Sequence, residues 1–359
     1  MIISWVSSYV YFKGGNGTNA EVFQKRFDKA VAAENIYEAA LYVENSTSNF
    51  SESYGYGGRD VDSPMIIASV TKMITAASVL KLCKKGQLSL DDKISHYIDD
   101  ETLQRLHVYK GVEYSGELTI SDLIFQTSGL PDYFTNSGWV KNKFLNEDQY
   151  ITFDQYIEEV KKLPPNFAPN TNKAYYADIN FDLLGEILEE VTGLPLDEVY
   201  KQLIFEPLGM EHTYLPVSED DFIPHIYNGS EKLERPLFIA SARASGGCVS
   251  TARDMMIFSK AFWNGELFDK EIFEQLSDYR KLQRAMSPIS YGGGHMKISL
   301  NGLNTFFLAK GELVGHSGST GSFVFYYPEK DLHIVGDFSQ FQNPGIPIRF
   351  IMKLAMSIK

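Results

Sequence analysis

The chain has 359 residues, of which 44% are hydrophobic, and its formal net charge at pH 7 is −13. This length can bury one large core or two smaller ones, and the acidic balance argues against nucleic acid and anionic membrane surfaces as partners. No apolar run approaches the length of about eighteen residues that a membrane-spanning helix requires, so we expect no integral membrane segment.

The N-terminal run MIISWVSSYVYFKGG is mildly apolar. It has no basic region before it and no clear small-residue cleavage site after it, so we interpret residues 1–18 as a strand or loose extension rather than a signal peptide. A cytoplasmic location is therefore expected. Export stays open if the N-terminus is atypical or incomplete.

The next elements alternate between helix and strand patterns. Residues 20–34 predict an amphipathic helix and residues 36–43 a strand. The Tyr- and Gly-rich run at residues 54–58 is typical of the end of a hairpin partner for that strand. Residues 69–85 are apolar on nearly every face and stop at Gly86, which predicts a central buried helix.

The pattern is mostly helical from about residue 100 to residue 225, and strand signals return after residue 235. Two helices are expected at residues 183–192 and 197–205, and a last helix follows Pro347. The later strands are expected at residues 247–250, 303–308, 322–327 and 332–338. This order predicts an α+β fold (an α/β sandwich), in which an antiparallel sheet is flanked by helices and carries an inserted all-α lobe.

We expect three segments in the chain. An N-terminal extension covers residues 1–18, and residues 19–100 and 225–359 together form an α/β domain. The helical domain inserted between them covers residues 101–224.

The sequence contains no residues in a recognisable metal-binding pattern. Cys83 and Cys248 each lie within an apolar stretch, which is typical of buried small hydrophobic residues rather than of a disulfide or zinc site. The glycine run at residues 292–294 has no Lys-Ser or Lys-Thr after it, so it is read as a strand with close backbone contacts. No H-E-x-x-H motif occurs, and we expect no metal and no other cofactor.

Ser69 and Lys72 are three residues apart at the start of the expected central helix. On a helix this spacing places both on one face, and the free N–H groups of the first turn lie beside the hydroxyl. An amine can then take the hydroxyl proton while the N–H groups hold the anion that forms on a carbonyl. Spacing alone is not specific, because Ser78 and Lys81 repeat it in mid-helix, where the N–H groups are already bonded.

Three further runs follow in the chain: residues 124–132 (IFQTSGLPD), residues 176–185 (YADINFDLLG) and residues 315–319 (GHSGS). Together with the Ser69-x-x-Lys72 motif, the chain resembles the serine β-lactamase and penicillin-binding-protein superfamily. The resemblance is closest to the branch of class C β-lactamases, DD-peptidases, D-aminopeptidases and related esterases, and it spans roughly residues 20–340.

The resemblance implies a role for each matching residue. Ser69 matches the acylated nucleophile, Lys72 its basic partner and Tyr176 the tyrosine that relays protons to the leaving group. The backbone N–H groups of Ser69 and Ser319 match the oxyanion hole. A tyrosine and a lysine whose pKa values both fall through burial and mutual charge can share one proton near neutrality.

Two positions depart from the family pattern, and we assign them with their neighbours to substrate binding. Asp178 replaces the usual asparagine, and such a carboxylate would weaken Lys72 as a base or repel a substrate carboxylate, unless it turns away. The triplet His316-Ser317-Gly318 replaces K-T-G and therefore lacks the lysine that helps to bind the carboxylate of β-lactams. Arg243, Lys310 or Ser317 are candidates to restore that binding.

Two of these residues also have a purely structural interpretation. Tyr176 is next to Tyr175 in a chain with 21 tyrosines, so its position alone favours packing in the core. The run Leu183-Leu184-Gly185 is what aligns Tyr176, and not Tyr175, with the family motif. His316 would be read as a histidine of a surface turn if glycines did not flank it.

The expected function is a serine hydrolase that acts through an acyl-enzyme on Ser69. It would cleave a small ester or a D-amino-acid amide or peptide, in the manner of a DD-peptidase or esterase, with weak β-lactamase activity at most. The alternative, kept open by Asp178, is a non-hydrolytic penicillin-binding or ligand-sensing module. An α/β-hydrolase is set aside because no G-x-S-x-G occurs. The expected partner is a small-molecule or peptide substrate, and no oligomeric state is predicted.

Overall fold

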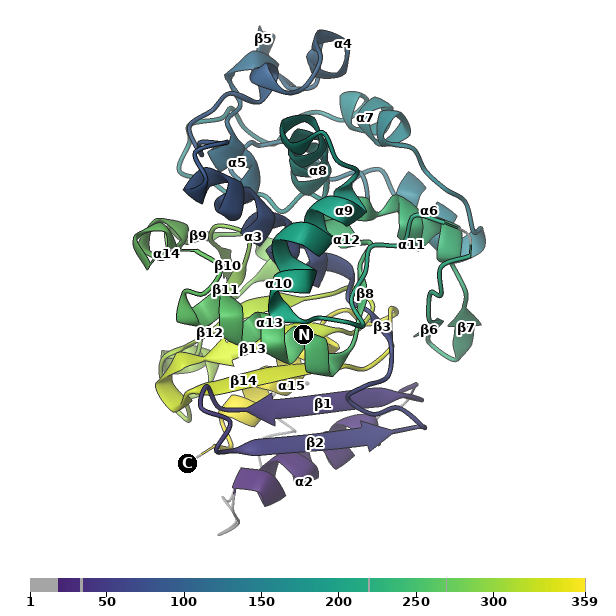
Figure 1. Cartoon of the computed structure of the whole chain (residues 1–359), viewed down its shortest axis with the longest axis vertical. Coiled ribbons are helices and arrows are strands. Elements are labelled where there is room, and N and C mark those ends of the chain that lie inside the picture. The colour runs from purple at the N-terminus through teal and green to yellow at the C-terminus, as the bar shows by residue number, and fades with distance from the viewer. Residues whose placement is uncertain (1–18, 33–34, 219, 269, 359) are drawn as a thin grey trace.

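A computed structural model describes residues 19–32, 35–218, 220–268 and 270–358 (Figure 1). The extension expected at residues 1–18, and with it the signal-peptide alternative, lies outside these residues. The main feature is an eight-stranded antiparallel sheet with the order β2-β1-β14-β13-β12-β11-β10-β9. Its strands are β1 (Ala39–Glu44), β2 (Ser51–Tyr56), β9 (Arg280–Lys281), β10 (Ile289–Tyr291), β11 (Met296–Ser299), β12 (Glu312–Ser317), β13 (Phe323–Tyr327) and β14 (Leu332–Asp337).

Helices pack on both faces of this sheet. All six residues of β14 are buried for this reason, because successive side chains of a strand point to opposite faces. His333 of β14 contacts Ser259 of α13 (Ala252–Asn264), with Nδ1 and Oγ 2.9 Å apart. On the opposite face, Phe323 packs on Phe350 of α15 (Ile346–Ala355). Helix α2 (Asn19–Val31) packs against α15, so the first and last helices described share this face.

The central helix α3 (Thr71–Lys84) lies between the sheet and a largely helical region, which is at the top of Figure 1. That region contains α4 (Asp100–Leu103), α5 (Ile120–Ile124), α6 (Trp139–Asn146), α7 (Phe153–Lys161), α8 (Ile179–Thr192), α9 (Leu196–Tyr200), α10 (Glu206–Leu208), α11 (Pro236–Ser241) and α12 (Arg243–Gly246). The other helix of the described residues is α14 (Lys270–Leu276). Two short hairpins pair β4 (Val108–Tyr109) with β5 (Val112–Glu113) and β6 (Ile226–Asn228) with β7 (Glu231–Leu233), and β3 (Met65–Ile66) pairs with β8 (Val249–Ser250) from a distant part of the chain.

The expected fold class is confirmed, since the sheet is antiparallel and flanked by helices. The strand expected at residues 36–43 pairs with its hairpin partner as β1 and β2. The division into an α/β domain and a helical domain remains a prediction.

Two local predictions are wrong, at residues 303–308 and at the glycine run after Tyr291. Residues 303–308 do not form a strand: a single 3-10 turn at Gly302–Asn304 is followed by Phe306 and Phe307 at φ of 53° and 63°, which strand pairing does not allow. The helix expected at residues 197–205 is confirmed, with α9 continuing as a π-helical turn at Lys201–Phe205. The three glycines after Tyr291 form the turn between β10 and β11 rather than a strand.

The close backbone contact expected at that glycine run is confirmed. Gly294 has a φ of 80°, and a Cβ placed there would collide with the Cβ of Ala76 on α3. Glycine therefore lets the β10–β11 turn rest directly on the central helix.

Of the two cysteines, Cys248 is buried and Cys83 is partly exposed, and both are free.

Candidate active site

Ser69 lies in a 3-10 turn (Ala68–Val70) that leads directly into α3. The preceding residue, Ala68, has a φ of 44°, a left-handed conformation that costs a residue with a Cβ about 1 kcal/mol or more. The hydroxyls of Thr320 and Ser322 donate to the two carbonyls just before Ala68, at 2.7 and 2.8 Å. The turn after β12 thus holds the strained backbone that presents the Ser69 hydroxyl.

Lys72 is fully buried one helical turn from Ser69. Its Nζ donates to Ser69 Oγ at 3.3 Å and to the carbonyl oxygen of Ser245 at 2.5 Å. It also lies 2.7 Å from Oδ1 of Asp178, a close ion pair that is not aligned as a hydrogen bond. Lys72 therefore has two hydrogen-bond acceptors and one carboxylate beside its amine, surroundings that favour an ammonium group.

Tyr176 completes this cluster. Its ring centroid is 5.1 Å from Lys72 Nζ, and its hydroxyl hydrogen-bonds with Ser69. Burial, and secondarily the charge of Asp178, raise the pKa of Tyr176 well above its ordinary value. The expectation of a tyrosine with a lowered pKa is therefore wrong, because desolvation outweighs the cation beside the ring, and Tyr176 is neutral at rest.

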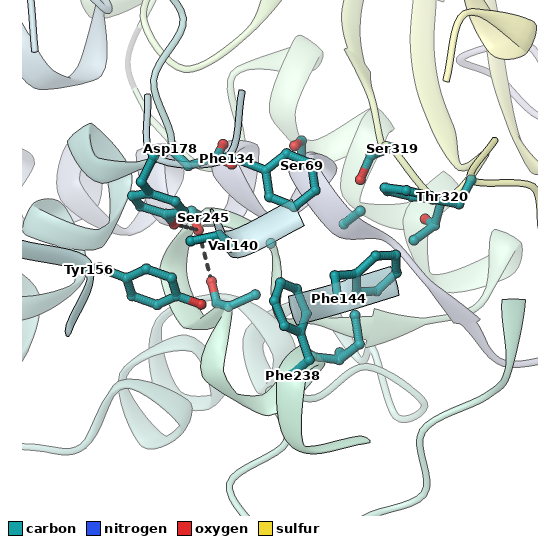
Figure 2. Close-up of a pocket in the computed structure, with 16 residues that line it drawn as sticks. Ser69, Phe134, Val140, Phe144, Tyr156, Asp178, Phe238, Ser245, Ser319 and Thr320 are labelled. Carbon is teal, nitrogen blue, oxygen red and sulfur yellow. Dashed lines mark hydrogen bonds between the residues drawn. The ribbon is translucent and has the colours of Figure 1, made fainter. Parts of the chain in front are cut away.

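Ser319 follows strand β12 and lines the same pocket as Ser69 (Figure 2). Among the residues that the structure describes, neither Ser69 nor Ser319 uses its backbone N–H in a hydrogen bond. A Cβ on Gly318, the residue before Ser319, would approach the carbonyl oxygen of Ile67 to 2.6 Å. Glycine therefore lets the chain after β12 pass close to the turn that carries Ser69. The two N–H groups remain available for an oxyanion.

None of the three residues of the triplet, His316, Ser317 and Gly318, is among the described residues that line this pocket. His316 is buried, with Nε2 3.4 Å from the hydroxyl of Tyr291 and Nδ1 2.9 Å from the carbonyl oxygen of Ser317. Burial, and secondarily the charge of Lys72, lower the pKa of His316 to about 3, so this imidazole is neutral. Its ring centroid is 6.0 Å from that of Tyr176, which makes it a packing neighbour of the cluster.

The candidates for binding a substrate carboxylate lie elsewhere. Arg243 is bound to Glu186 and Glu189 at 2.6 and 2.5 Å. Lys310 and Ser317 are also absent from the described residues that line the pocket.

Two buried carboxyl groups beside the cluster were not anticipated. Asp132 accepts a hydrogen bond from the backbone N–H of Asp178 at 3.1 Å, and Asp182 accepts one from the hydroxyl of Tyr133 at 2.7 Å. Burial, with a further contribution from Asp178, raises the pKa of Asp132 to about 6 and that of Asp182 to about 7. The four-residue spacing of Asp178 and Asp182 on one helix face was the available signal.

The pocket beside Ser69 is open to solvent and has a mostly apolar wall, and the space within it, open solvent included, is about 490 Å³. Figure 2 shows Asp178, Ser69 and Ser319 along one side of it and the rings of Phe144, Phe238 and Tyr156 along the other. The complete lining is Ala68, Ser69, Tyr133, Phe134, Val140, Phe144, Tyr156, Asp178, Phe238, Ile239, Ala242, Ser245, Gly246, Ser319, Thr320 and Phe341. An apolar group attached to a reactive carbonyl fits such a wall.

Two further findings apply to the described residues. None of their helices combines the length and the apolar character needed to cross a bilayer. They also contain no group of three or more His, Cys, Asp or Glu side chains that could hold a metal ion.

A serine–lysine–tyrosine cluster at the start of a central helix, beside an antiparallel sheet, defines the class of serine hydrolase-like proteins. The sequence pattern of the family described as Beta-lactamase matches residues 23–346. The chain belongs to this family, and so to the serine β-lactamase and penicillin-binding-protein superfamily.

Relatives within the superfamily are diverse. A provisionally named D-alanyl-D-alanine carboxypeptidase of Escherichia coli K12 is 28% identical over 252 residues, which is 65% of this chain; the match spans about half (52%) of the relative's length. A D-stereospecific amidohydrolase from Streptomyces sp. has a TM-score of 0.75 at 22% identity, covering 90% of this chain and 95% of that one. A D-amino acid amidase from Ochrobactrum anthropi SV3, with L-phenylalanine amide, has a TM-score of 0.75 at 20% identity, covering 94% and 98%. The two structures establish the fold.

Proposed function

We propose that the chain is a serine hydrolase that forms an acyl-enzyme on Ser69 and cleaves a small ester or a D-amino-acid amide or peptide. The observation that carries this proposal is the contact of one hydroxyl with both Lys72 and Tyr176 at the edge of an apolar pocket. The amidase and carboxypeptidase names among the similar proteins support the amide and peptide substrates. β-Lactams are expected to be poor substrates at most.

In the proposed mechanism, Lys72 accepts the proton of the Ser69 hydroxyl as Oγ attacks the substrate carbonyl. Lys72 can accept this proton only as a neutral amine, so an ammonium at this position first has to release one proton to solvent. Its contact with Asp178 opposes that release, since a carboxylate at 2.7 Å stabilises the charged amine. Loosening this contact is therefore part of activating the nucleophile.

The proton then passes from Lys72 through the hydroxyl of Tyr176 to the departing nitrogen or oxygen. A neutral tyrosine suits this step, because it can donate one proton and regain another. The N–H groups of Ser69 and Ser319 are the proposed donors to the oxyanion. Water then attacks the ester on Ser69 and releases the acid product.

The serine–lysine repeat in α3 provides a matched control for the test. Ser78 donates to the carbonyl oxygen of Ile74 at 3.0 Å inside the helix and is fully buried. With p-nitrophenyl acetate and D-phenylalanine amide, we expect Ser69→Ala to lower kcat/KM by roughly 10³-fold or more and to abolish any covalent adduct in intact-mass spectra. Ser78→Ala should hydrolyse both substrates at a rate near that of the wild type. Turnover that persists in Ser69→Ala would refute the proposal.

The non-hydrolytic penicillin-binding module remains the second candidate. The Lys72–Asp178 ion pair favours it, because a lysine held in its charged form cannot activate the water that releases the acyl group. A fluorescent penicillin separates the two functions. A stable adduct on Ser69, with no turnover of any ester or amide, would favour the module over the hydrolase.

A further inference from the structure

The wall of the pocket includes a preformed aromatic surface. The ring of Phe144 lies 4.9 Å from that of Phe238 and 4.5 Å from that of Phe341, centroid to centroid. Tyr133 stacks on Tyr156 at 4.4 Å. These contacts position the rings without a substrate, so an aromatic or large aliphatic side chain can enter with little reorganisation.

Among the described residues that line the pocket, Asp178 is the only charged one. Its Oδ1 contacts Lys72, and the side chain is 20% exposed. In the part of the chain that the structure describes, Oδ1 of Asp178 accepts no hydrogen bond, and the carboxylate pairs with Lys72. A partly exposed carboxylate on a pocket wall can bind a second cation.

No lysine or arginine is among the described residues that line the pocket. Lys72, fully buried, pairs with Asp178 at 2.7 Å and offsets part of its charge, and Arg243 is bound to Glu186 and Glu189. The buried carboxyl groups of Asp132 and Asp182 lie beside Asp178 and add to the negative potential whenever they are ionised. This potential repels a carboxylate next to the scissile bond and attracts an ammonium.

We propose that the pocket selects an acyl group with a primary ammonium beside the scissile carbonyl and an aromatic or large aliphatic side chain, joined to a leaving group without a carboxylate, and that Asp178 binds the ammonium. The proposal rests on the proposed hydrolase function of Ser69. Such a substrate also acts on Lys72, because its ammonium shares Asp178 with Lys72 and adds positive charge beside it. Both effects favour release of the proton that Lys72 must lose before it accepts the proton of Ser69.

The first test uses the wild-type enzyme and matched substrates. Phenylalanine p-nitroanilide, in its D and L forms, is compared with 3-phenylpropanoyl p-nitroanilide, which lacks only the ammonium. D-Phenylalanyl-D-alanine amide is compared with D-phenylalanyl-D-alanine, which adds a carboxylate. We expect kcat/KM to be higher by about tenfold or more for the better phenylalanine form than for the ammonium-free substrate, and for the amide than for the free acid. Equal or inverted values would overturn the inference, whereas Ser69-dependent ester hydrolysis would leave the hydrolase function intact.

The second test is Asp178→Asn, with Glu186→Gln as the control for removing a carboxylate outside this pocket. The measured quantity is the ratio of kcat/KM with and without the ammonium, taken within each variant. A general loss of activity through Lys72 cancels in this ratio. We expect Asp178→Asn to bring the ratio to within about twofold of one, and Glu186→Gln to keep the wild-type ratio. An unchanged ratio in Asp178→Asn would overturn the role of Asp178.

Discussion

At the residue scale, the neutral hydroxyl of Tyr176 distinguishes two kinds of leaving group. An amide nitrogen must be protonated as it departs, whereas p-nitrophenolate departs without a proton. We therefore expect Tyr176→Phe to lower kcat/KM for amides by roughly 10²- to 10⁴-fold and for p-nitrophenyl esters by much less. Steady-state kinetics with both substrate types measure this difference.

The neighbouring tyrosine is the matched control for that prediction. Tyr175 exchanges hydrogen bonds with the side chain of Asn136, at 2.9 and 3.2 Å, near the surface. Tyr175→Phe should leave the kinetics with both substrates nearly unchanged. Equal losses for esters and amides in Tyr176→Phe would point to a structural role for the ring and not to proton donation.

At the scale of elements, the active site depends on how closely α8 and α12 approach each other. The carbonyl oxygen of Ser245 on α12 binds Lys72, so the position of α12 determines one of the two hydrogen-bond acceptors of Nζ. A Cβ on Gly185 of α8 would lie 2.7 Å from the Cβ of Ala244. Neither atom can move without moving its helix, which is why glycine is needed here.

We expect Gly185→Ala to lower the free energy of unfolding by about 1–3 kcal/mol and to reduce kcat as α12 shifts. Because alanine is the better helix former, propensity alone predicts the opposite sign for stability. Urea denaturation and steady-state kinetics measure the two effects. Gly116→Ala is the control, since a Cβ there meets no atom within 4 Å. If Gly185→Ala instead raised the free energy of unfolding, α8 and α12 would be able to move apart at little cost, and the prediction would be wrong.

At the scale of the whole molecule, buried acids and buried histidines affect the pH dependence of stability in opposite directions. Burial raises the pKa of Asp182 to about 7 and that of Asp337 to about 6. Their stabilising contribution is complete below pH ~4 and is lost as the pH rises through these values, because the folded chain then has to ionise a buried acid. Burial lowers the pKa of His295 to about 4 and that of His316 to about 3. Their contribution grows as the pH rises to about 6.5.

The two trends oppose each other between pH ~4 and pH ~6.5; above that range the histidines of the unfolded chain are mostly neutral, and the remaining titration of Asp182 lowers the free energy of unfolding toward pH 8. Asp182→Asn should reduce the fall between pH 6 and pH 8, because it removes the acid with a pKa of about 7. Chemical denaturation across this range measures the slope. Asp62→Asn, a half-exposed aspartate paired with Arg253, should leave the slope unchanged. A slope that Asp182→Asn does not alter would contradict this account.

Much of the fold could be predicted because, in most segments, the apolar periodicity of the sequence matches the face that is buried. The hairpin of β1 and β2 and the helices α2, α3, α8 and α15 follow from apolar periodicity with glycine or proline at their ends. Residues 303–308 misled the prediction, because Leu303 and Phe307 are apolar but 77% and 74% exposed. An apolar run predicts a strand only if its side chains are buried, and burial is decided by distant parts of the chain.

The sequence by itself determined the serine–lysine pair, because a three-residue spacing on one helix turn sets their separation locally. It also determined the family, through motifs that occur in one order along the chain. Only the tertiary structure decided how Lys72 is bound, since its contacts with Asp178 and the carbonyl of Ser245 join residues more than one hundred positions away in the chain. The charge state of Tyr176 and the aromatic wall were likewise decided there, because desolvation and cavity shape arise only when separate elements pack together.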